Sequence, residues 1–243
     1  MKKIILTLIF FSLLGIGIII SVLSTTGYET SKFNSLITNK IMENNKNIKA
    51  DIKKIKFKFD LSNISLFLET INPEVSYKNL EIPIKSIKVY LDFVSLIQSK
   101  IKISKMEISS NNLDITQLKK IIIKTKPTNL NSFILNKVNK GELTTNVQLF
   151  FDENLNVKNF IAKGSVNNFF AKIEENLKIK NSSFDFIADF SDVLVKNFKS
   201  ELAGIVLKDG SLQINKREKD ILLKSDFTTE VVADDENTKK YLE

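Results

Sequence analysis

The chain has 243 residues, with 36 Lys and Arg against 28 Asp and Glu, a net charge of +8, and neither His nor Cys. Without His and Cys, Ser-His-Asp and Cys-His catalysis and the usual zinc, haem and iron–sulfur sites are excluded. Arg217 is the only arginine, and Arg is the residue preferred for bidentate contacts to phosphates and bases. We therefore expect no enzyme activity, no metal site, no cofactor and no nucleic-acid partner.

An uncharged, mostly apolar run from Ile4 to Leu23 follows Lys2 and Lys3. As a helix, this run is long enough to span the hydrocarbon core of a bilayer. Because the positive charges precede the run and Glu29 follows it, the positive-inside rule predicts a cytoplasmic N-terminus with the rest of the chain across the membrane. A cleaved signal peptide is the alternative, but the run exceeds the usual signal core and no small-x-small site follows it.

A short amphipathic helix is predicted directly after the membrane segment. Ser31 can cap it, and the polar run Asn44–Asn47 is expected to end it. Four apolar residues share one face of this helix: Phe33, Leu36, Ile37 and Ile41. Two interpretations stay open, a helix that plugs the end of the following sheet and an interfacial helix that lies on the membrane.

From Asp51 onward the apolar period changes from 3.6 to 2, which predicts β-strands. A switch of parity near Lys85 and Ser86, and a second slip before Met106, are typical of β-bulges. The alternating apolar residues of this first block include Ile55, Phe57, Phe59, Leu61, Ile64, Leu66, Leu68, Ile82, Ile84, Ile87, Val89, Leu91, Ile101, Ile103, Met106, Ile108, Leu113 and Ile115.

A second block of strands is predicted from about Lys119. Gly141 opens a strand, the acidic turn Asp152–Asn154 follows, and the chain returns toward Gly164. Further strands are expected from Val166 and at Leu177–Ile179, Phe184–Phe190, Leu202–Leu207, Leu212–Ile214 and Ile221–Phe227. Short helices are expected only at Thr116–Ile123 or Asn131–Val138 and as a single turn at Val94–Gln98.

The predicted fold is mainly β: an N-terminal transmembrane helix and a short amphipathic helix, then an elongated, curled antiparallel sheet shaped like a groove. We expect three parts, residues 1–29 as cytoplasmic tip and anchor, 30–118 as the first β unit and 119–243 as the continuing sheet. Every strand offers apolar residues on one side, and something must cover that side. Either a second sheet closes over it, or it stays open to acyl chains.

Three stretches carry a family resemblance. They are the strand Ile52–Leu61, the segment Asn79–Ile108 with a turn formed by Leu91, Asp92, Ser95, Leu96 and Ile97, and the later segment Gly141–Val166. Asp92 or Ser95 can cap the brief helical turn. In this order, after one membrane helix, they resemble the N-terminal region of the AsmA-like family.

The resemblance implies an inner-membrane-anchored, periplasmic β-groove that binds or conducts phospholipid for the outer membrane and catalyses no reaction. Its partners would be the acyl chains of membrane phospholipids. The residues expected to contact them are Ile55, Phe57, Phe59, Ile87, Val89, Leu91, Ile101 and Ile103. For each of these residues, a plain core role remains the alternative.

Two other functions are weighed against lipid binding. A membrane-anchored β scaffold, on the plan of LptC, would dock another envelope protein at an edge strand near Phe227–Val232. A hydrolase using Asp185, Asp189 and Asp192 is the third. Asp185 and Asp189 have the parity opposite to Phe184 and Phe186, so we expect solvated charges on an outer face.

Overall fold

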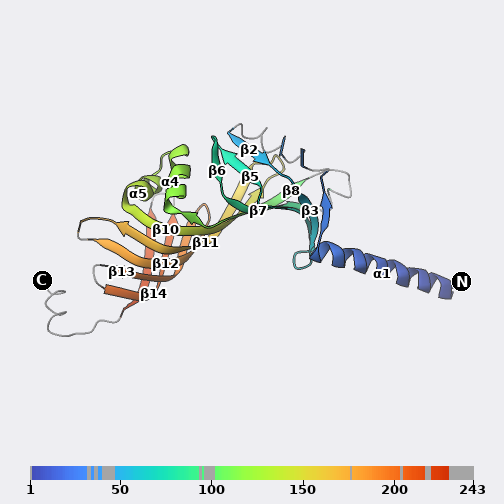
Figure 1. The fold of residues 1–243 in the computed structure, drawn as a ribbon. Coiled ribbons are helices and arrows are strands. Elements are labelled where there is room, and N and C mark those ends of the chain that lie inside the picture. Colours follow the sequence, from blue (N-terminus) through green and yellow to red (C-terminus); the bar gives the residue numbers. More distant parts are fainter. Residues whose placement is uncertain are drawn as a thin grey trace. The chain divides into compact units, whose positions relative to one another are not determined.

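The structure is a computed structural model that describes residues 2–31, 34–35, 38–39, 47–92, 95, 102–175, 177–202, 205–216 and 220–229. It is mainly β, with one N-terminal apolar helix and a large antiparallel sheet of 12 strands that is not closed into a barrel (Figure 1). The predicted fold class is confirmed. The apolar positions of the predicted amphipathic helix, Phe33, Leu36, Ile37 and Ile41, lie outside the described residues.

The N-terminal helix α1 spans Lys2–Thr25. Its part Lys3–Thr25 is long and apolar enough to cross a membrane, and its large apolar side chains from Ile4 to Val22 are exposed except for that of Ile20, which is half-buried. A helix that is apolar on all sides suits a surrounding of lipid. Gly27 lies just beyond the end of the helix, where its φ of 71° and the hydrogen bond of 2.9 Å from its N–H to the Val22 carbonyl form a glycine C-cap.

The main sheet has the strand order β1-β3-β4-β7-β8-β10-β11-β12-β13-β14-β15, and β9 pairs with β10. Its strands are β1 (Tyr28–Thr30), β3 (Ile55–Asp60), β4 (Ser65–Ile71), β7 (Ile84–Leu91), β8 (Ile103–Ser110), β9 (Leu113–Asp114), β10 (Val138–Phe151), β11 (Val157–Lys172), β12 (Lys178–Ala188), β13 (Asp192–Leu202), β14 (Ile205–Lys216) and β15 (Ile221–Thr229). A separate three-stranded sheet has the order β2-β5-β6, with β2 (Ile48–Asp51), β5 (Glu74–Tyr77) and β6 (Leu80–Ile82).

Two short helices, both at predicted places, interrupt the strands. Helix α4 (Ile115–Lys124) begins after Asp114, whose carboxylate accepts backbone N–H groups while the Gln117 side chain accepts the Asp114 N–H. This reciprocal pair is a capping box. Helix α5 (Asn129–Lys137) begins after Thr128, whose hydroxyl accepts a backbone N–H of the first turn.

Both predicted bulges are present between β7 and β8. The register shifts between Ile84 and Ser86, and again at Ser104, which is the extra residue on β8. The turn after β7 also begins as predicted, since Asp92 Oδ1 accepts the Ser95 N–H at 2.7 Å. The two residues that follow Ser95 lie outside the described residues.

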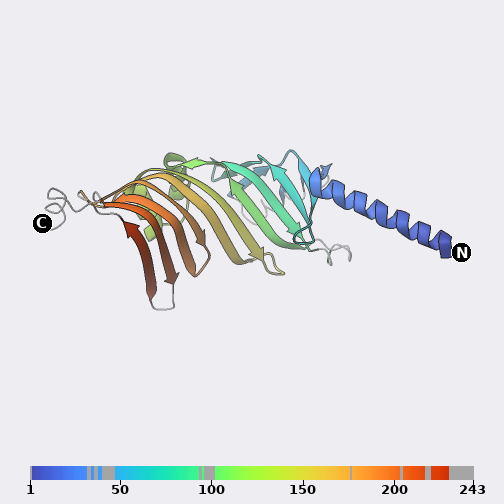
Figure 2. The ribbon, with the colours of Figure 1, turned by 90° about the horizontal axis from the view of Figure 1, so that it is seen from below.

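The chain forms two compact units, each of which is described by itself below. Unit 1 comprises Met1–Ser110 with Gln148–Phe160, and unit 2 comprises Asn111–Val147 with Ile161–Glu243. The hairpin of β10 and β11 contributes to both. Figure 2 shows the strands of unit 2 side by side and bending along their length. The limits predicted at residues 29 and 118 stay predictions, because compactness does not test independent folding.

Candidate functional site

Seven of the eight predicted lipid-binding residues lie on one face of β3, β4, β7 and β8 in unit 1. Opposite residues of an antiparallel pair project to the same side. The strand register therefore defines three rows, which are Phe59, Leu66, Leu91 and Ile103, then Phe57, Leu68, Val89 and Met106, then Thr70, Ile87 and Ile108 with Ile55. We call these residues the covered apolar face. Ile101, the eighth, lies outside the described residues.

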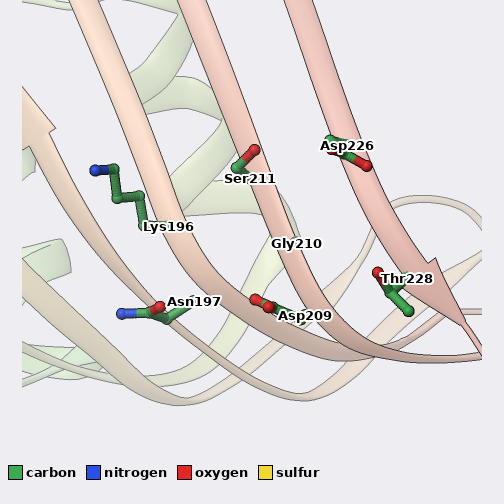
Figure 3. Close-up of a pocket in the computed structure, with 7 residues that line it drawn as sticks. All are labelled: Lys196, Asn197, Asp209, Gly210, Ser211, Asp226 and Thr228. Atoms are coloured by element: carbon green, nitrogen blue, oxygen red, sulfur yellow. The ribbon is translucent and has the colours of Figure 1, made fainter.

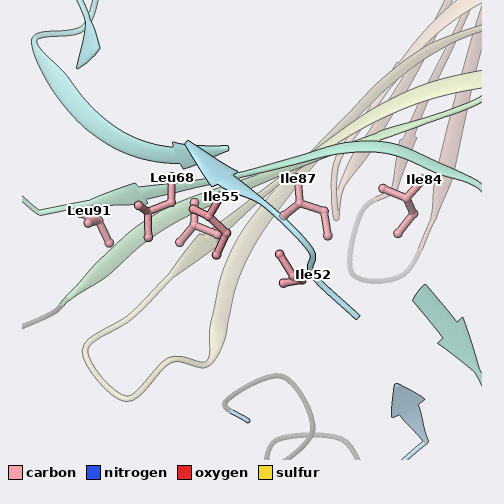
Figure 4. Close-up of a cluster of buried hydrophobic side chains, with 7 residues drawn as sticks. Ile52, Ile55, Leu68, Ile84, Ile87 and Leu91 are labelled. Atoms are coloured by element: carbon pink, nitrogen blue, oxygen red, sulfur yellow. The ribbon is translucent and has the colours of Figure 1, made fainter. Parts of the chain in front are cut away.

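Other parts of unit 1 bury most of this face. A core cluster contains four of the predicted residues, Ile55, Ile87, Val89 and Leu91, which are 1%, 6%, 6% and 6% exposed (Figure 4). Val75 of β5 and Ile82 of β6 pack against this cluster, so the small sheet forms part of the cover. The other three, Phe57, Phe59 and Ile103, are half-buried. Four of the predicted lipid contacts thus lie in a packed core, and three at half-buried positions of the same face.

The opposite side of β4, β7 and β8 is a polar–aromatic cluster. The Phe67 and Tyr90 rings are both buried and stack with centroids 5.2 Å apart. Lys105 Nζ lies 3.9 Å from the Tyr90 ring centroid and 2.8 Å from Glu107 Oε1. Glu107 also accepts the Tyr90 hydroxyl at 3.3 Å and the Gln148 amide at 3.1 Å. Burial, together with the negative charge of Glu107, raises the pKa of the Tyr90 phenol.

Unit 2 carries a second apolar face, on β11–β15. The register again defines rows, which are Ala162, Ala188, Val193, Ile214 and Leu223, then Gly164, Phe186, Val195, Leu212 and Ser225, then Val166 with Phe184 and Gly210 with Phe227. We call these residues, with Phe169 and Phe198, the open apolar face. It contains none of the residues that the sequence predicted to bind lipid.

Four phenylalanines from four strands form a continuous series on the open apolar face. The ring centroids of Phe169 and Phe184 are 5.9 Å apart, those of Phe184 and Phe198 5.9 Å, and those of Phe198 and Phe227 5.7 Å. Gly210 of β14 makes room for the last ring, because a Cβ at this position would lie 2.3 Å from Phe227 Cδ1. The series provides a band of aromatic surface that runs across the strands.

The open apolar face is much less buried than the covered one. Among the residues that the structure describes, no large apolar side chain of β12–β15 is buried, and Phe227 and Leu223 are 40% and 59% exposed. The buried apolar residues of unit 2 lie on β9, α4, the start of β10 and the end of β11: Leu113, Ile122, Val138 and Ala171. An apolar surface of this breadth that is only partly buried is typical of a site of interaction. Alternation alone could not identify it, because alternation does not show which strands a second layer covers.

The other side of the unit 2 sheet carries many polar residues beside Ile187 and Leu194, and its backbone is irregular on three neighbouring strands. Asn168, Asn181 and Asn197 have φ values of 52°, 50° and 53°, in the left-handed region that Asn tolerates better than most residues. A pocket beside Asn197 is lined by polar and charged groups, with Lys196, Asp209 and Asp226 among them (Figure 3). Its charges make it a poor place for an apolar ligand.

The three aspartates considered as a hydrolase site have structural partners. The Asp189 carboxylate accepts the N–H groups of Ser191 and Asp192, both at 2.8 Å, and these bonds lower its pKa. Asp185 accepts the side-chain amide of Asn197 at 2.7 Å. Within the described part of the chain, no group of three or more Asp and Glu side chains could hold a metal ion. The geometry gives these carboxylates turn-capping and strand-bridging roles.

Comparison of the chain with protein-family models, with curated proteins and with solved structures finds no match. The resemblance to the AsmA-like family therefore stays a prediction from the motifs quoted above. Within the described residues, the fold has one candidate membrane helix and a large open antiparallel sheet, one region of which carries an apolar face that is half-buried on β11–β14 and exposed on β15.

Proposed function

We propose that α1 anchors this protein in the inner membrane with the N-terminus in the cytoplasm and the sheet in the periplasm, where the open apolar face binds phospholipid acyl chains for the outer membrane. The observation that carries the proposal is the incomplete burial of that face, whose large apolar side chains are half-buried on β11–β14 and exposed on β15. A chain with a candidate membrane helix works where phospholipids are abundant. Acyl chains match the face chemically, because they offer apolar surface and demand no hydrogen bonds.

Binding on this face would be driven by removal of apolar surface from water, at about 25 cal/mol for each Å² buried. An acyl chain lying across the strands would contact Phe184, Phe198 and Phe227 in turn, with neighbouring strands about 4.8 Å apart. Apolar contact has no preferred direction, so one position along the aromatic series is nearly equivalent to the next. This property suits a surface that binds or conducts lipid without chemical change.

Tryptophan fluorescence tests this proposal, because the chain has no Trp of its own. We would place single tryptophans by Phe198→Trp on the open apolar face and Met106→Trp on the covered one, in the full chain reconstituted in phospholipid vesicles. Phospholipids with brominated acyl chains quench a neighbouring indole. We expect strong quenching for Phe198→Trp and weak quenching for Met106→Trp. Equal quenching of both, or none for Phe198→Trp, would contradict lipid binding at the open apolar face.

A membrane-anchored scaffold is the second candidate, favoured by the position of β15. Among the described residues, this strand is the last in the sheet order, and eight of its nine residues are exposed. An exposed edge strand can accept a strand from another chain by backbone hydrogen bonding. The predicted docking edge Phe227–Val232 lies within the described residues only as far as Thr229. Loss of a partner on substitution of edge residues, with lipid quenching unchanged, would favour this role.

A further inference from the structure

The edge strand β15 has a sequence that is complementary to itself. It reads Ile-Leu-Leu-Lys-Ser-Asp-Phe-Thr-Thr from Ile221 to Thr229, with Ser225 at its centre. In an antiparallel pair of two such strands with the two Ser225 residues opposite each other, Lys224 of each copy faces Asp226 of the other. In the same arrangement, Leu223 of each copy faces Phe227 of the other. Both kinds of cross-strand pair stabilise a sheet.

We propose that β15 pairs with β15 of a second copy of this chain, in antiparallel register about a two-fold axis at Ser225. A two-fold symmetric dimer requires such a self-complementary surface, since each contact must occur twice. Pairing also covers a long exposed edge, which otherwise invites uncontrolled association. The pattern of charged and apolar residues on β15 therefore identifies a second copy of the same strand as its partner.

The neighbouring registers lack this complementarity. A register centred on Lys224 places the two lysines opposite each other, and one centred on Asp226 does the same with the two carboxylates. Like charges directly opposite each other destabilise a strand pair. Registers shifted by one residue relative to the partner place the apolar side of one strand on the polar side of the other. Among these registers, the one centred on Ser225 is alone in pairing opposite charges.

Both charges lack an opposite charge across the existing pair of strands. In the β14–β15 register, Lys224 lies opposite Gln213, and Asp226 lies opposite Ser211. Leu223 lies opposite Ile214, so the apolar side of β15 continues that of β14. A second β15 would thus supply the complementary charges on one side of the sheet and join two open apolar faces on the other. The proposal does not rest on lipid binding, and neither of its tests measures contact with lipid.

A disulfide tests the register directly, because the chain contains no Cys. Residues opposite each other on paired strands have Cβ atoms about 4.5–5.5 Å apart, close enough for a disulfide after a small adjustment. We expect Ser225→Cys to form a covalent dimer in native membranes under mild oxidation. The matched control is Ser211→Cys on β14, which lies one strand away from the axis and should stay monomeric on a non-reducing gel.

Charge exchange tests the pairing in the purified full chain, with the dimer fraction measured by analytical ultracentrifugation in detergent. Lys224→Asp alone and Asp226→Lys alone each create like-charged pairs, and each should weaken the dimer by about tenfold or more. The double variant K224D/D226K should restore it. An equimolar mixture of the two single variants should form a mixed dimer, because each then supplies the charge that the other lacks.

Several outcomes would overturn the proposal. A monomeric wild-type chain at all concentrations would do so, as would equal cross-linking of Ser225→Cys and Ser211→Cys. A dimer that tolerates both single charge reversals would show that the contact lies elsewhere. Misfolding of the variants is checked by circular dichroism, and the mixed-dimer experiment distinguishes it from repulsion, because misfolded chains would not regain pairing on mixing.

Discussion

The covered apolar face of unit 1 and the open apolar face of unit 2 are built from the same alternating pattern and differ in what lies over them. On β4 and β7, Leu68 and Val89 are 4% and 6% exposed, and Val75 and Ile82 of the small sheet pack against their cluster. On β15, Leu223 is 59% exposed. An apolar stripe is therefore a core or a binding surface according to whether a second layer covers it.

The two units also differ on their opposite sides. In unit 1 the reverse of the sheet buries Phe67 and Tyr90 within a network of lysine and glutamate side chains. In unit 2 the reverse carries exposed charges such as Lys196 and Asp226, which line a polar pocket. Unit 1 thus has two buried faces on β4 and β7, and we expect it to carry the greater share of the stability.

The largest contrast is expected from a buried charge. Val89→Asp places a carboxylate in the packed core of unit 1 without a partner, which should cost more than about 4 kcal/mol and unfold unit 1. Val195→Asp places the same group on the half-exposed face of unit 2 and should leave the chain folded. Hydrogen–deuterium exchange of the full chain in detergent reports each unit separately. Loss of protection at unit 2 with Val195→Asp would contradict an open face.

Truncation of a leucine should also destabilise the covered apolar face more than the open one, by a smaller amount than a buried charge does. Leu68→Ala removes a side chain that is 4% exposed, at an expected cost of about 2–5 kcal/mol. Leu223→Ala removes one that is 59% exposed and should cost less than about 1 kcal/mol. The measurement is the shift of the urea midpoint for each variant. Equal shifts would show that both faces are packed to the same degree.

Substitution of two glycines of unit 2 by alanine should destabilise the chain to different degrees, according to the atoms that surround each glycine. A Cβ at Gly164 would lie 2.2 Å from the backbone oxygen of Thr144, so Gly164→Ala must move a strand and should cost about 1–3 kcal/mol. At Gly210 the obstacle is the ring of Phe227, which is 40% exposed and can turn away. Gly210→Ala should therefore cost less. The measurement is the thermal unfolding of each variant. A larger destabilisation by Gly210→Ala than by Gly164→Ala would contradict the loose packing of Phe227 at the β15 edge.

The smallest expected effect is a loss of folding stability at alkaline pH, and it should be confined to unit 1. The pKa of Tyr90 is raised on folding, so the folded chain favours the protonated phenol. This stability is fully present below the ordinary tyrosine pKa, about 10, and is lost as the pH rises from there through the raised value. Tyr90→Phe cannot ionise and should reduce the alkaline destabilisation. Hydrogen–deuterium exchange would be measured at pH 8 and at pH 10.5 for both proteins. The loss of protection between the two pH values should be smaller in Tyr90→Phe than in wild type within unit 1, and equal in the two proteins within unit 2.

Much of the fold could be predicted from the sequence because strand period and turn chemistry are local. The change of period at Asp51, the bulge at Ser86 and the cap at Asp92 are each specified by neighbouring residues. The site could not be predicted in the same way. Val89 and Val195 each follow an apolar residue two positions earlier, Ile87 and Val193, so the local sequence places both valines on an apolar face. Only the long-range placement of Val75 and Ile82 makes Val89 a core residue. Tyr90 also escaped notice, because its burial on the polar side depends on Phe67 and Lys105 from other strands.

Lipid binding at the open apolar face is tested most directly by a map of lipid contacts on the full chain. Phospholipids with a photoactivatable group in the acyl chain would be incorporated with the protein into vesicles, illuminated, and the adducts located by mass spectrometry of peptides. We expect adducts on α1 and on the peptides of β12–β15, with those around Val195 reduced by Val195→Asp, and few on β4 and β7. Adducts confined to α1 would show that the anchor alone meets lipid and that the open apolar face serves another partner.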